Sequence, residues 1–292
     1  MKIGIDTGTI CNKVPDEREA IRRYADIGFD ALDYGYCAHV GEDSVFLKED
    51  WEEYADSLAR TARECGILFS QAHAPMYSWR NTPEDIRRLD ELTRRAFRVC
   101  EIIGAPYLVI HPRMKPDCIN GENAQRDLMA NVQWYRTLLP LAKKHHVKIA
   151  LENMFGWDPL VSRNCRTTFS TCEEMLECIR LLDSEDVVVC LDTGHSHLVR
   201  QPLAQEARLL GKHLKLLHVH DNCGFNDEHL APGYGSIPWP EFLSALRDIG
   251  YDGVFSAETF RMGTAVPAEA SVQAIKLVYA ILDSLLRENG LR

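Results

Sequence analysis

Six side chains that can bind a divalent metal or move a proton each end a short apolar run of this sequence. They are His73 in QAH, His111 in LVIH, Glu152 in IALE, Asp192 in VCLD, His218 in LLH and Glu258 in FSAE. Short apolar runs are typical of buried strands, so these groups lie at the edge of a dry interior. Because an unpaired buried carboxylate costs several kcal/mol, carboxylates that converge there need a cation. The sequence therefore predicts a metal site.

We predict that one divalent ion is held by three carboxylates and one imidazole, from Glu152, Asp192, His218 and Glu258. This donor set suits Mn²⁺, Mg²⁺, Co²⁺ or Zn²⁺ and differs from the nitrogen- and sulfur-rich set of a structural zinc site. The ligands do not choose among these metals. For any one residue alone, a helix cap or a hydrogen-bonded core histidine is an equally good explanation. The recurrence of such residues at equivalent strand ends favours the metal.

The segment from 215 onward indicates where the site lies. Within 215–220 the period of two of a strand places His218 and His220 on the same face. Asp227 and His229 follow in a stretch rich in Gly, Asn and Pro, which is typical of a loop. A strand that stays apolar until its last residues and then delivers ligand-type residues into a loop indicates the carboxyl-terminal mouth of a parallel barrel.

The order of the predicted elements indicates the fold. Apolar runs of strand length alternate with runs of helical periodicity along the whole chain. The strands are expected over 2–6, 31–36, 67–73, 107–111, 148–152, 187–192, 215–220 and 253–258, and the helices over 16–27, 49–65, 83–103, 122–146, 171–182, 202–210, 239–249 and 267–287. This pattern predicts an α/β fold, a (β/α)₈ TIM barrel that forms one domain over 1–292. A doubly wound open sheet is the alternative, but GxGxxG does not follow the first strand, so we expect no nucleotide cofactor.

Composition limits the classes of partner. Lys and Arg number 33 against 43 Asp and Glu, a net charge of −10, which disfavours nucleic acid or an anionic membrane as the main partner. No apolar run approaches the roughly 18 residues of a membrane span, and the first residues do not have the pattern of a secretion signal. The ten cysteines are scattered without a CxxC pair, as expected of reduced core residues. We expect a cytoplasmic protein.

Seven motifs give the chain a family resemblance over nearly its whole length. They are HAP at 73–75, HP at 111–112, LEN at 151–153, LDTGH at 191–195, HVHDN at 218–222, PGYGSIPW at 232–239 and the strand that ends in Glu258. With these motifs the sequence resembles the xylose isomerase-like TIM-barrel superfamily. That superfamily contains sugar (phosphate) isomerases and epimerases, inosose dehydratases and apurinic endonucleases of the endonuclease IV type.

The resemblance implies roles for individual residues. Glu152, Asp192, His218 and Glu258 match the metal ligands, and the two glutamates match the acid and base. His218 is preferred to His220 because an acid, Asp221, follows it by three residues. The superfamily often forms oligomers, so a homo-oligomer is also expected.

The same resemblance leaves a site with three metals open. His195 matches a position that binds substrate in the epimerases and metal in the endonucleases, and further counterparts of endonuclease ligands are His73, His111, Asp227 and His229. The sequence departs from the endonuclease pattern in two places, because Gly194 replaces a cysteine and the loop 221–235 contains no Lys or Arg. It departs from the ketose epimerase pattern at Gly224, where an arginine is common.

We therefore expect a pocket for a small sugar or polyol instead of further metals. The residues predicted to line it are His73, His111, His195, His220, Asp227, His229, Trp157 and Arg261. An aromatic ring can form the wall of a sugar site and an arginine can bind a phosphate or carboxylate. Packing against a neighbouring loop and solvated surface charge are the alternatives for Trp157 and Arg261.

The function predicted from the sequence is a metal-dependent isomerase or epimerase that moves a proton through an enediolate. Its substrate would be a sugar, a sugar phosphate or a polyol ketone. Three alternatives stay open at this point. They are a trinuclear-zinc phosphodiesterase of the endonuclease IV type, a lyase of the same superfamily (an inosose dehydratase or a C-glycoside-cleaving subunit), and a barrel that only binds a metal or a sugar.

Overall fold

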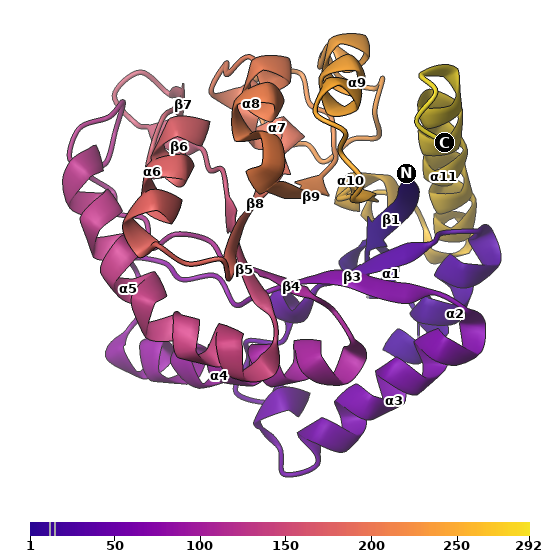
Figure 1. Ribbon diagram of the computed structural model, residues 1–292. Coiled ribbons are helices and arrows are strands. Elements are labelled where there is room, and N and C mark those ends of the chain that lie inside the picture. The colour runs from indigo at the N-terminus through magenta and orange to yellow at the C-terminus, as the bar shows by residue number, and fades with distance from the viewer. Residues whose placement is uncertain (12, 15) are drawn as a thin grey trace.

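The computed structural model describes residues 1–292 except residues 12 and 15, and its centre is a parallel barrel (Figure 1). Eight strands lie in the order β10-β1-β2-β3-β4-β5-β8-β9. A parallel bridge between Val219 and Ala257 joins the two ends of this sheet. The strands are β1 (Lys2–Asp6), β2 (Ala31–Tyr34), β3 (Leu68–His73), β4 (Tyr107–Val109), β5 (Lys148–Glu152), β8 (Val187–Asp192), β9 (Leu214–His218) and β10 (Val254–Ala257). The predicted (β/α)₈ barrel is confirmed.

The long helices surround the barrel, as Figure 1 shows. They are α2 (Glu17–Ile27), α3 (Trp51–Cys65), α4 (Pro83–Ile103), α5 (Ala124–His145), α6 (Cys172–Leu182), α8 (Leu203–Leu210), α9 (Trp239–Asp248) and α11 (Ala268–Glu288). Local signals fix their ends. Thr82 and Asp85 form a capping box at the start of α4, and Gly104 ends this helix with a left-handed φ of 78°.

Apolar side chains divide into two layers across the strands. Val109, Ala150, Val188, Cys190 and Leu216 form a small buried cluster that is separate from the large core between strands and helices. Leu217 and Val219 belong to the large core, so the alternation predicted along this strand is confirmed. The interior of the barrel is thus apolar, and ionisable groups are left for the strand ends.

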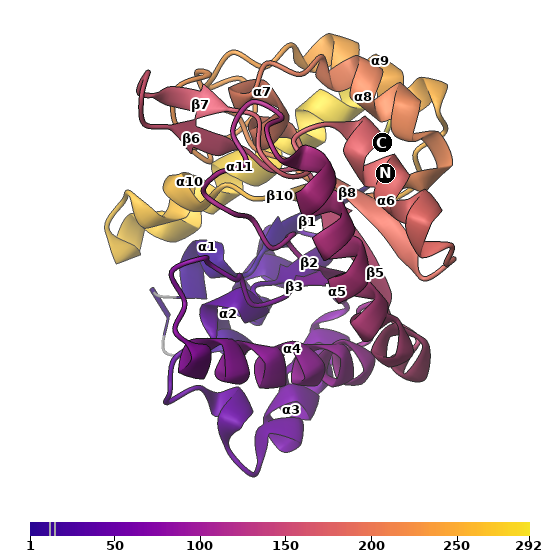
Figure 2. The ribbon, with the colours of Figure 1, turned by 90° about the vertical axis from the view of Figure 1, so that its left-hand side faces the viewer.

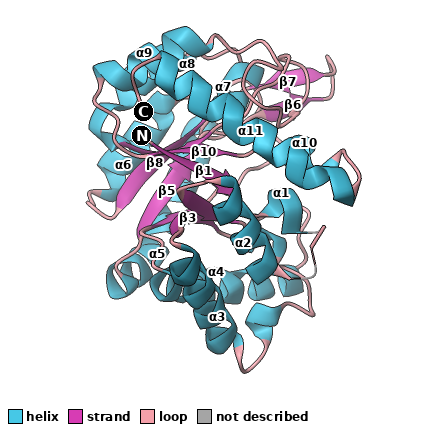
Figure 3. Cartoon of the chain, turned by 90° about the vertical axis from the view of Figure 1, so that its right-hand side faces the viewer, coloured by secondary structure: helices cyan, strands magenta, loops and turns pink. Residues whose placement is uncertain are grey.

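Several short elements were not predicted. The expected loop after β5 contains a hairpin, and short helices follow three of the strands. These elements are α1 (Gly8–Cys11), β6 (Gly156–Asp158), β7 (Arg163–Cys165), α7 (Thr193–Leu198) and α10 (Phe260–Thr264), with 3₁₀ turns η1 (Tyr36–Ala38), η2 (Val45–Leu47) and η3 (Gly211–His213). Figures 2 and 3 both place α1, α10 and the β6–β7 hairpin at one end of the barrel. These elements follow the carboxyl ends of β1, β10 and β5, so they border the mouth of the site.

Two further expectations concern the whole chain. Among the described cysteines none forms a disulfide, and Cys100, Cys118, Cys165, Cys172, Cys178 and Cys190 are buried. The side chain of Cys11 lies outside the description. In the part of the chain that the structure describes, no helix has the length and apolar character needed to cross a membrane.

Candidate active site

Four of the predicted residues converge at the carboxyl-terminal mouth of the barrel. Glu152 ends β5, Asp192 ends β8, His218 ends β9 and Glu258 directly follows β10. One ligand atom from each lies within 4.8 Å of one from every other, and all four residues are buried. We call this group the tetrad. Three carboxylates and one imidazole at this spacing fit a single divalent cation.

The imidazole of His218 is oriented by a residue that sequence reasoning missed. Its Nδ1 lies 2.9 Å from Glu152 Oε1 and 3.6 Å from Glu258 Oε2, so this nitrogen points into the tetrad. Its Nε2 lies 2.9 Å from Asp33 Oδ2, and Gln71 Nε2 donates to the same oxygen at 2.7 Å. A carboxylate on the far nitrogen of a histidine is the usual support of a metal ligand. The sequence signal for Asp33 was its place near the end of the apolar strand ALDY.

Burial acts differently on the two glutamates of the tetrad. Burial alone would raise the pKa of Glu152, but the nearby imidazoles of His218 and His111 outweigh it and hold that pKa well below its usual range. Burial also raises the pKa of Glu258, and there His218 and His229 offset it only in part. The pKa of Asp6 at the end of β1 is raised by burial, by Asp33 and by Glu258. The mouth is therefore crowded with carboxylates.

His73 and His111 form a pair beside Glu152. Their Nε2 atoms are 3.0 Å apart, and His111 Nε2 lies 2.8 Å from Glu152 Oε2. Since His218 contacts Oε1 of the same carboxylate, both oxygens of Glu152 are held by imidazoles. Ligand atoms of His73, His111 and Glu152 also lie within 4.8 Å of one another.

The remaining predicted polar residues gather around Asp227. Its Oδ2 lies 2.9 Å from His229 Nε2 and 3.7 Å from His195 Nε2. His220 Nε2 lies 3.0 Å from Asp192 Oδ1, and its ring stacks on His229 at 4.1 Å. Burial would lower the pKa of His195, but neighbouring carboxylates, chiefly Asp192, raise it to about 10. Apart from Trp157 and Arg261, the predicted ligand and pocket residues, ten in number, thus form one connected cluster.

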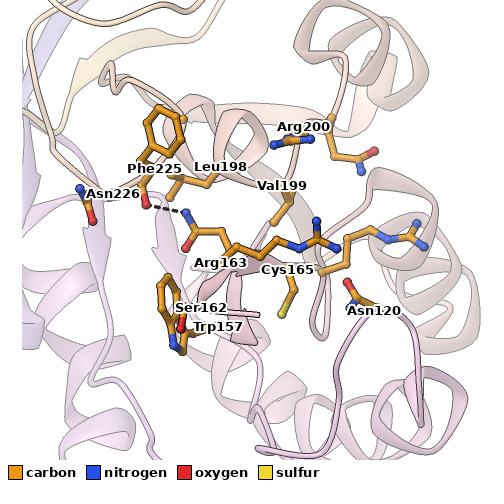
Figure 4. Close-up of a pocket in the computed structure, with 14 residues that line it drawn as sticks. Asn120, Trp157, Ser162, Arg163, Cys165, Leu198, Val199, Arg200, Phe225 and Asn226 are labelled. Atoms are coloured by element: carbon orange, nitrogen blue, oxygen red, sulfur yellow. Dashed lines mark hydrogen bonds between the residues drawn. The ribbon is translucent and has the colours of Figure 1, made fainter. Parts of the chain in front are cut away.

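Trp157 and Arg261 lie outside this cluster. Trp157 is on β6 with 54% of its surface exposed, and it lines a cavity of about 480 Å³ (Figure 4). Arg261 lies on α10 and is exposed. Neither side chain forms a hydrogen bond or salt bridge to the tetrad among the residues described.

Two contacts near the end of β9 explain why Asp221 and Gly194 occur in the sequence motifs. Asp221 accepts hydrogen bonds from the backbone of Gly233 and Ile237 and from Trp239 Nε1 at 2.9, 3.1 and 2.9 Å, so its role is to hold the loop after β9 together. A Cβ built on Gly194 would lie 1.9 Å from His220 Cε1. Any side chain at 194 would therefore displace His220 from Asp192.

Comparison with known proteins agrees with this architecture. A family model described as xylose isomerase-like TIM barrel matches residues 21–281. D-psicose 3-epimerase of Enterocloster bolteae is 27% identical over 266 residues, which are 88% of this chain and 81% of that enzyme. Inosose isomerase of Bacillus subtilis is 28% identical over 184 residues, which are 61% of this chain. The match spans only 62% of the length of that isomerase, and the same share of an uncharacterised relative from Methanocaldococcus jannaschii.

Solved structures share the fold. The crystal structure of the IolI protein with a bound zinc atom has a TM-score of 0.75 and 22% identity, and the match covers 98% of this chain and 99% of that one. At this identity the likeness concerns the fold alone.

Proposed function

This chain belongs to the xylose isomerase-like TIM-barrel family, and on that premise we propose that it is a divalent-metal-dependent isomerase or epimerase of a sugar or polyol ketone. The observation that carries the proposal is the tetrad, in which two glutamates from different strands lie within 4.8 Å of the same imidazole and carboxylate. The family includes relatives named as a D-psicose 3-epimerase and an inosose isomerase.

Glu152, Asp192, His218 and Glu258 would hold the metal. The support from geometry is the buried donor set and the orientation of His218 by Asp33, whose other oxygen, Oδ1, is buried without a hydrogen-bond partner among the described residues. When bound, the ion supplies a Lewis acid for a carbonyl oxygen and its neighbouring hydroxyl.

The two glutamates would transfer the proton. One carboxylate takes the proton from the carbon next to the carbonyl, which leaves a planar enediolate. The other carboxyl group then delivers a proton to the opposite face, so the configuration at that carbon is inverted. Proton count is conserved, because one proton is taken and one is given back.

The two glutamates differ in their contacts, and this difference suits a pair in which one carboxyl group is fixed and the other can move. Both oxygens of Glu152 are held, by His218 at 2.9 Å and by His111 at 2.8 Å. Among the described residues, the carboxylate of Glu258 has only longer contacts, 3.6 Å to His218 and 3.9 Å to His229. Glu258 is therefore the base that can reorient during a turnover, and Glu152 is the fixed one.

The test is isotope exchange with a panel of ketoses and inososes in D₂O, using the metal-loaded protein. We expect one member of the panel to give an isomer or epimer that carries deuterium on the carbon next to the carbonyl. Because a glutamate can return the proton that it took, the label is measured in both recovered substrate and product. Conversion of substrate with label in neither would contradict the proposal.

A second candidate, phosphodiester hydrolysis with more than one metal, is favoured by one observation. Three further donor groups flank the tetrad. They are His73–His111–Glu152, Asp192–His195–His220 and His220–His229–Glu258. Against it stand the loop 221–235, which has no Lys or Arg, and the contact of Gly194 with His220. Three zinc ions per chain together with cleavage of abasic DNA would replace the isomerase proposal with this one.

A further inference from the structure

A cavity next to the site has a charge opposite to that of the chain as a whole. It measures about 480 Å³ and is lined by parts of the β6–β7 hairpin, the end of α7 and the loop around 225. The described residues that line it include three arginines, Arg163, Arg166 and Arg200, and no aspartate or glutamate. The net charge of the chain is −10, so a cavity with three positive and no negative lining residues is unusual for this molecule.

These three guanidinium groups are not neutralised by partners of their own. Among the described residues none of the three forms a salt bridge or a side-chain hydrogen bond. Two acids lie in the surroundings without forming an ion pair with these arginines. Asp158 is the cross-strand partner of Arg163 in the β6–β7 hairpin, and Glu174 on α6 interacts electrostatically with Arg166 at longer range. The three guanidinium groups therefore remain able to form ion pairs with a ligand.

A second cavity provides a contrast. Arg113 lines a separate cavity together with Tyr77 and Trp134, but there its guanidinium is bound to Asp90 at 2.9 Å and stacks on both rings at 4.4 and 4.5 Å. The guanidinium of Arg113 is therefore already bound by side chains of the protein. Arg163, Arg166 and Arg200 are available to an outside anion.

The two ends of the cavity are lined by different kinds of residue. In Figure 4, Trp157, Phe225 and Asn226 lie at one end, Arg200 and Asn120 at the other, and Arg163 between them. The walls are tied together, because Asn164 Nδ2 donates to Phe225 O at 2.8 Å and Asn120 N donates to Arg166 O at 2.8 Å. Asn226 is followed by Asp227, which contacts His195 and His229 of the site. The aromatic end of the cavity is thus the end nearest the histidines.

From this arrangement we propose that the cavity binds a phosphate monoester at the far end of the substrate, so that the substrate of the proposed isomerase is a phosphorylated ketose or polyol ketone. A phosphate monoester carries about −1.5 to −2 charge at pH 7, and guanidinium groups bind it through paired hydrogen bonds. Trp157 and Phe225 would contact the sugar body between the phosphate and the reacting carbon. The inference rests on the proposed function for the identity of the substrate, although anion binding by the cavity does not depend on it.

A small monoester fits better than a nucleic acid. A polyanion is bound by a stripe of basic residues along its backbone. Here the three arginines surround one cavity, and the adjoining loop 221–235 contains no Lys or Arg.

The experiment compares binding of a ketose monophosphate, the same ketose without phosphate, inorganic phosphate and a single-stranded oligonucleotide by calorimetry. Wild type should bind the phosphate ester at least about tenfold more tightly than the parent ketose, since one charge-assisted hydrogen bond accounts for about this factor. R163A and R200A should each lose about tenfold in affinity for the ester and for inorganic phosphate, with unchanged affinity for the parent ketose.

Arg63→Ala is the matched control, because Arg63 is an exposed arginine at the end of α3 and its removal changes the net charge equally. It should bind all four ligands as wild type does. Equal affinity of wild type for ester and parent ketose, or equal losses in Arg63→Ala and R163A, would overturn the inference. Arginine-dependent binding of the oligonucleotide without preference for the monoester would overturn it in favour of nucleic acid.

The same set separates the two proposals. If no ketose or ester is converted but arginine-dependent ester binding persists, the isomerase proposal fails and the anion site stands. If unphosphorylated ketoses are converted and phosphate neither binds nor competes, the anion site fails and the isomerase proposal stands.

Discussion

Two clusters in this molecule combine a glutamate with histidine, one half-buried beside α2 and one buried at the mouth of the barrel. They differ in whether their polar atoms are satisfied within the protein. Glu17 on α2 accepts hydrogen bonds from Tyr34 and Tyr54 hydroxyls at 2.9 and 2.7 Å and pairs with His39 at 2.9 Å. In this cluster one carboxylate is paired with one imidazole and accepts hydrogen bonds from two hydroxyl groups. We call it the closed cluster.

The cluster at the mouth is built from the same residue types but is not closed. Asp33 Oδ1, Asp227 Oδ1 and His220 Nδ1 are buried with no hydrogen-bond partner among the described residues. Buried polar atoms are rarely left without partners, and exceptions concentrate at functional sites. The comparison indicates that an ion pair whose polar atoms are all satisfied stabilises the fold. A cluster with buried polar atoms that have no partner is instead suited to bind a ligand.

The largest effect is expected from the two glutamates of the tetrad. Glu152→Gln and Glu258→Gln should each lower turnover by at least about 100-fold, which is typical of losing a general base. Glu17→Gln is the control from the closed cluster and should keep wild-type turnover per folded molecule. Steady-state kinetics on the substrate found by isotope exchange measures this. Full turnover in both tetrad variants would remove these residues from the chemistry.

Next in size is the effect on metal affinity. Asp192→Ala and His218→Ala should lose the bound ion on dialysis, since each removes one of four ligands, while His39→Ala of the closed cluster should retain it. Elemental analysis after dialysis measures the difference. If His218→Ala holds metal as wild type does, the ligand assignment is wrong.

A smaller effect is expected from Asp33, which contacts His218 and is not one of the four predicted ligands. Asp33→Asn should weaken metal binding by about 10-fold to 100-fold, as loss of a carboxylate behind a histidine ligand does. Titration with a competing chelator measures this, and Gln71→Ala serves as a milder variant because Gln71 supports Asp33 at 2.7 Å. An unchanged affinity in Asp33→Asn would show that His218 does not need this support.

The smallest effect concerns stability alone. Glu17→Gln should cost about 2 kcal/mol of unfolding free energy, because a charged acceptor is lost from three donors. Burial raises the pKa of Glu17, but His39 and the two tyrosines outweigh it and lower that pKa below its ordinary value of 4.5. A lowered folded pKa gives stability that is present above pH 4.5 and is lost as the pH falls below it. Urea unfolding at pH 7 and pH 4 should show the gap between wild type and variant shrinking, and a constant gap would contradict this role.

The sequence predicted the strand ends well and their supports poorly. The convergence of Glu152, Asp192 and His218 could be predicted because each ends an apolar run, and the barrel brings strand ends together wherever the chain alternates strand and helix. Asp33 was missed because its role depends on a neighbour, His218, that lies 185 residues away in the chain. Only the closing of the barrel reveals that contact.

Short elements at the mouth were missed for a different reason. The hairpin β6–β7 pairs just three residues on each side, which is too short for a period of two to be visible. The tetrad residue Asp192 is the N-cap of α7, because its side chain accepts a hydrogen bond from His195 N at 2.6 Å. A motif noted for its chemistry therefore also caps a helix. Trp157 was assigned to the substrate pocket without knowledge of this hairpin, which places it in the arginine-lined cavity.

The central claim is that the open cluster at the mouth holds one divalent ion through the tetrad. The most direct measurement is the metal content of the purified wild-type protein, determined by elemental analysis against protein concentration after dialysis. The account predicts about one equivalent of a single divalent metal per chain. A value near three, or a value near zero that stays near zero after incubation with Mn²⁺, Co²⁺, Mg²⁺ and Zn²⁺, would contradict it.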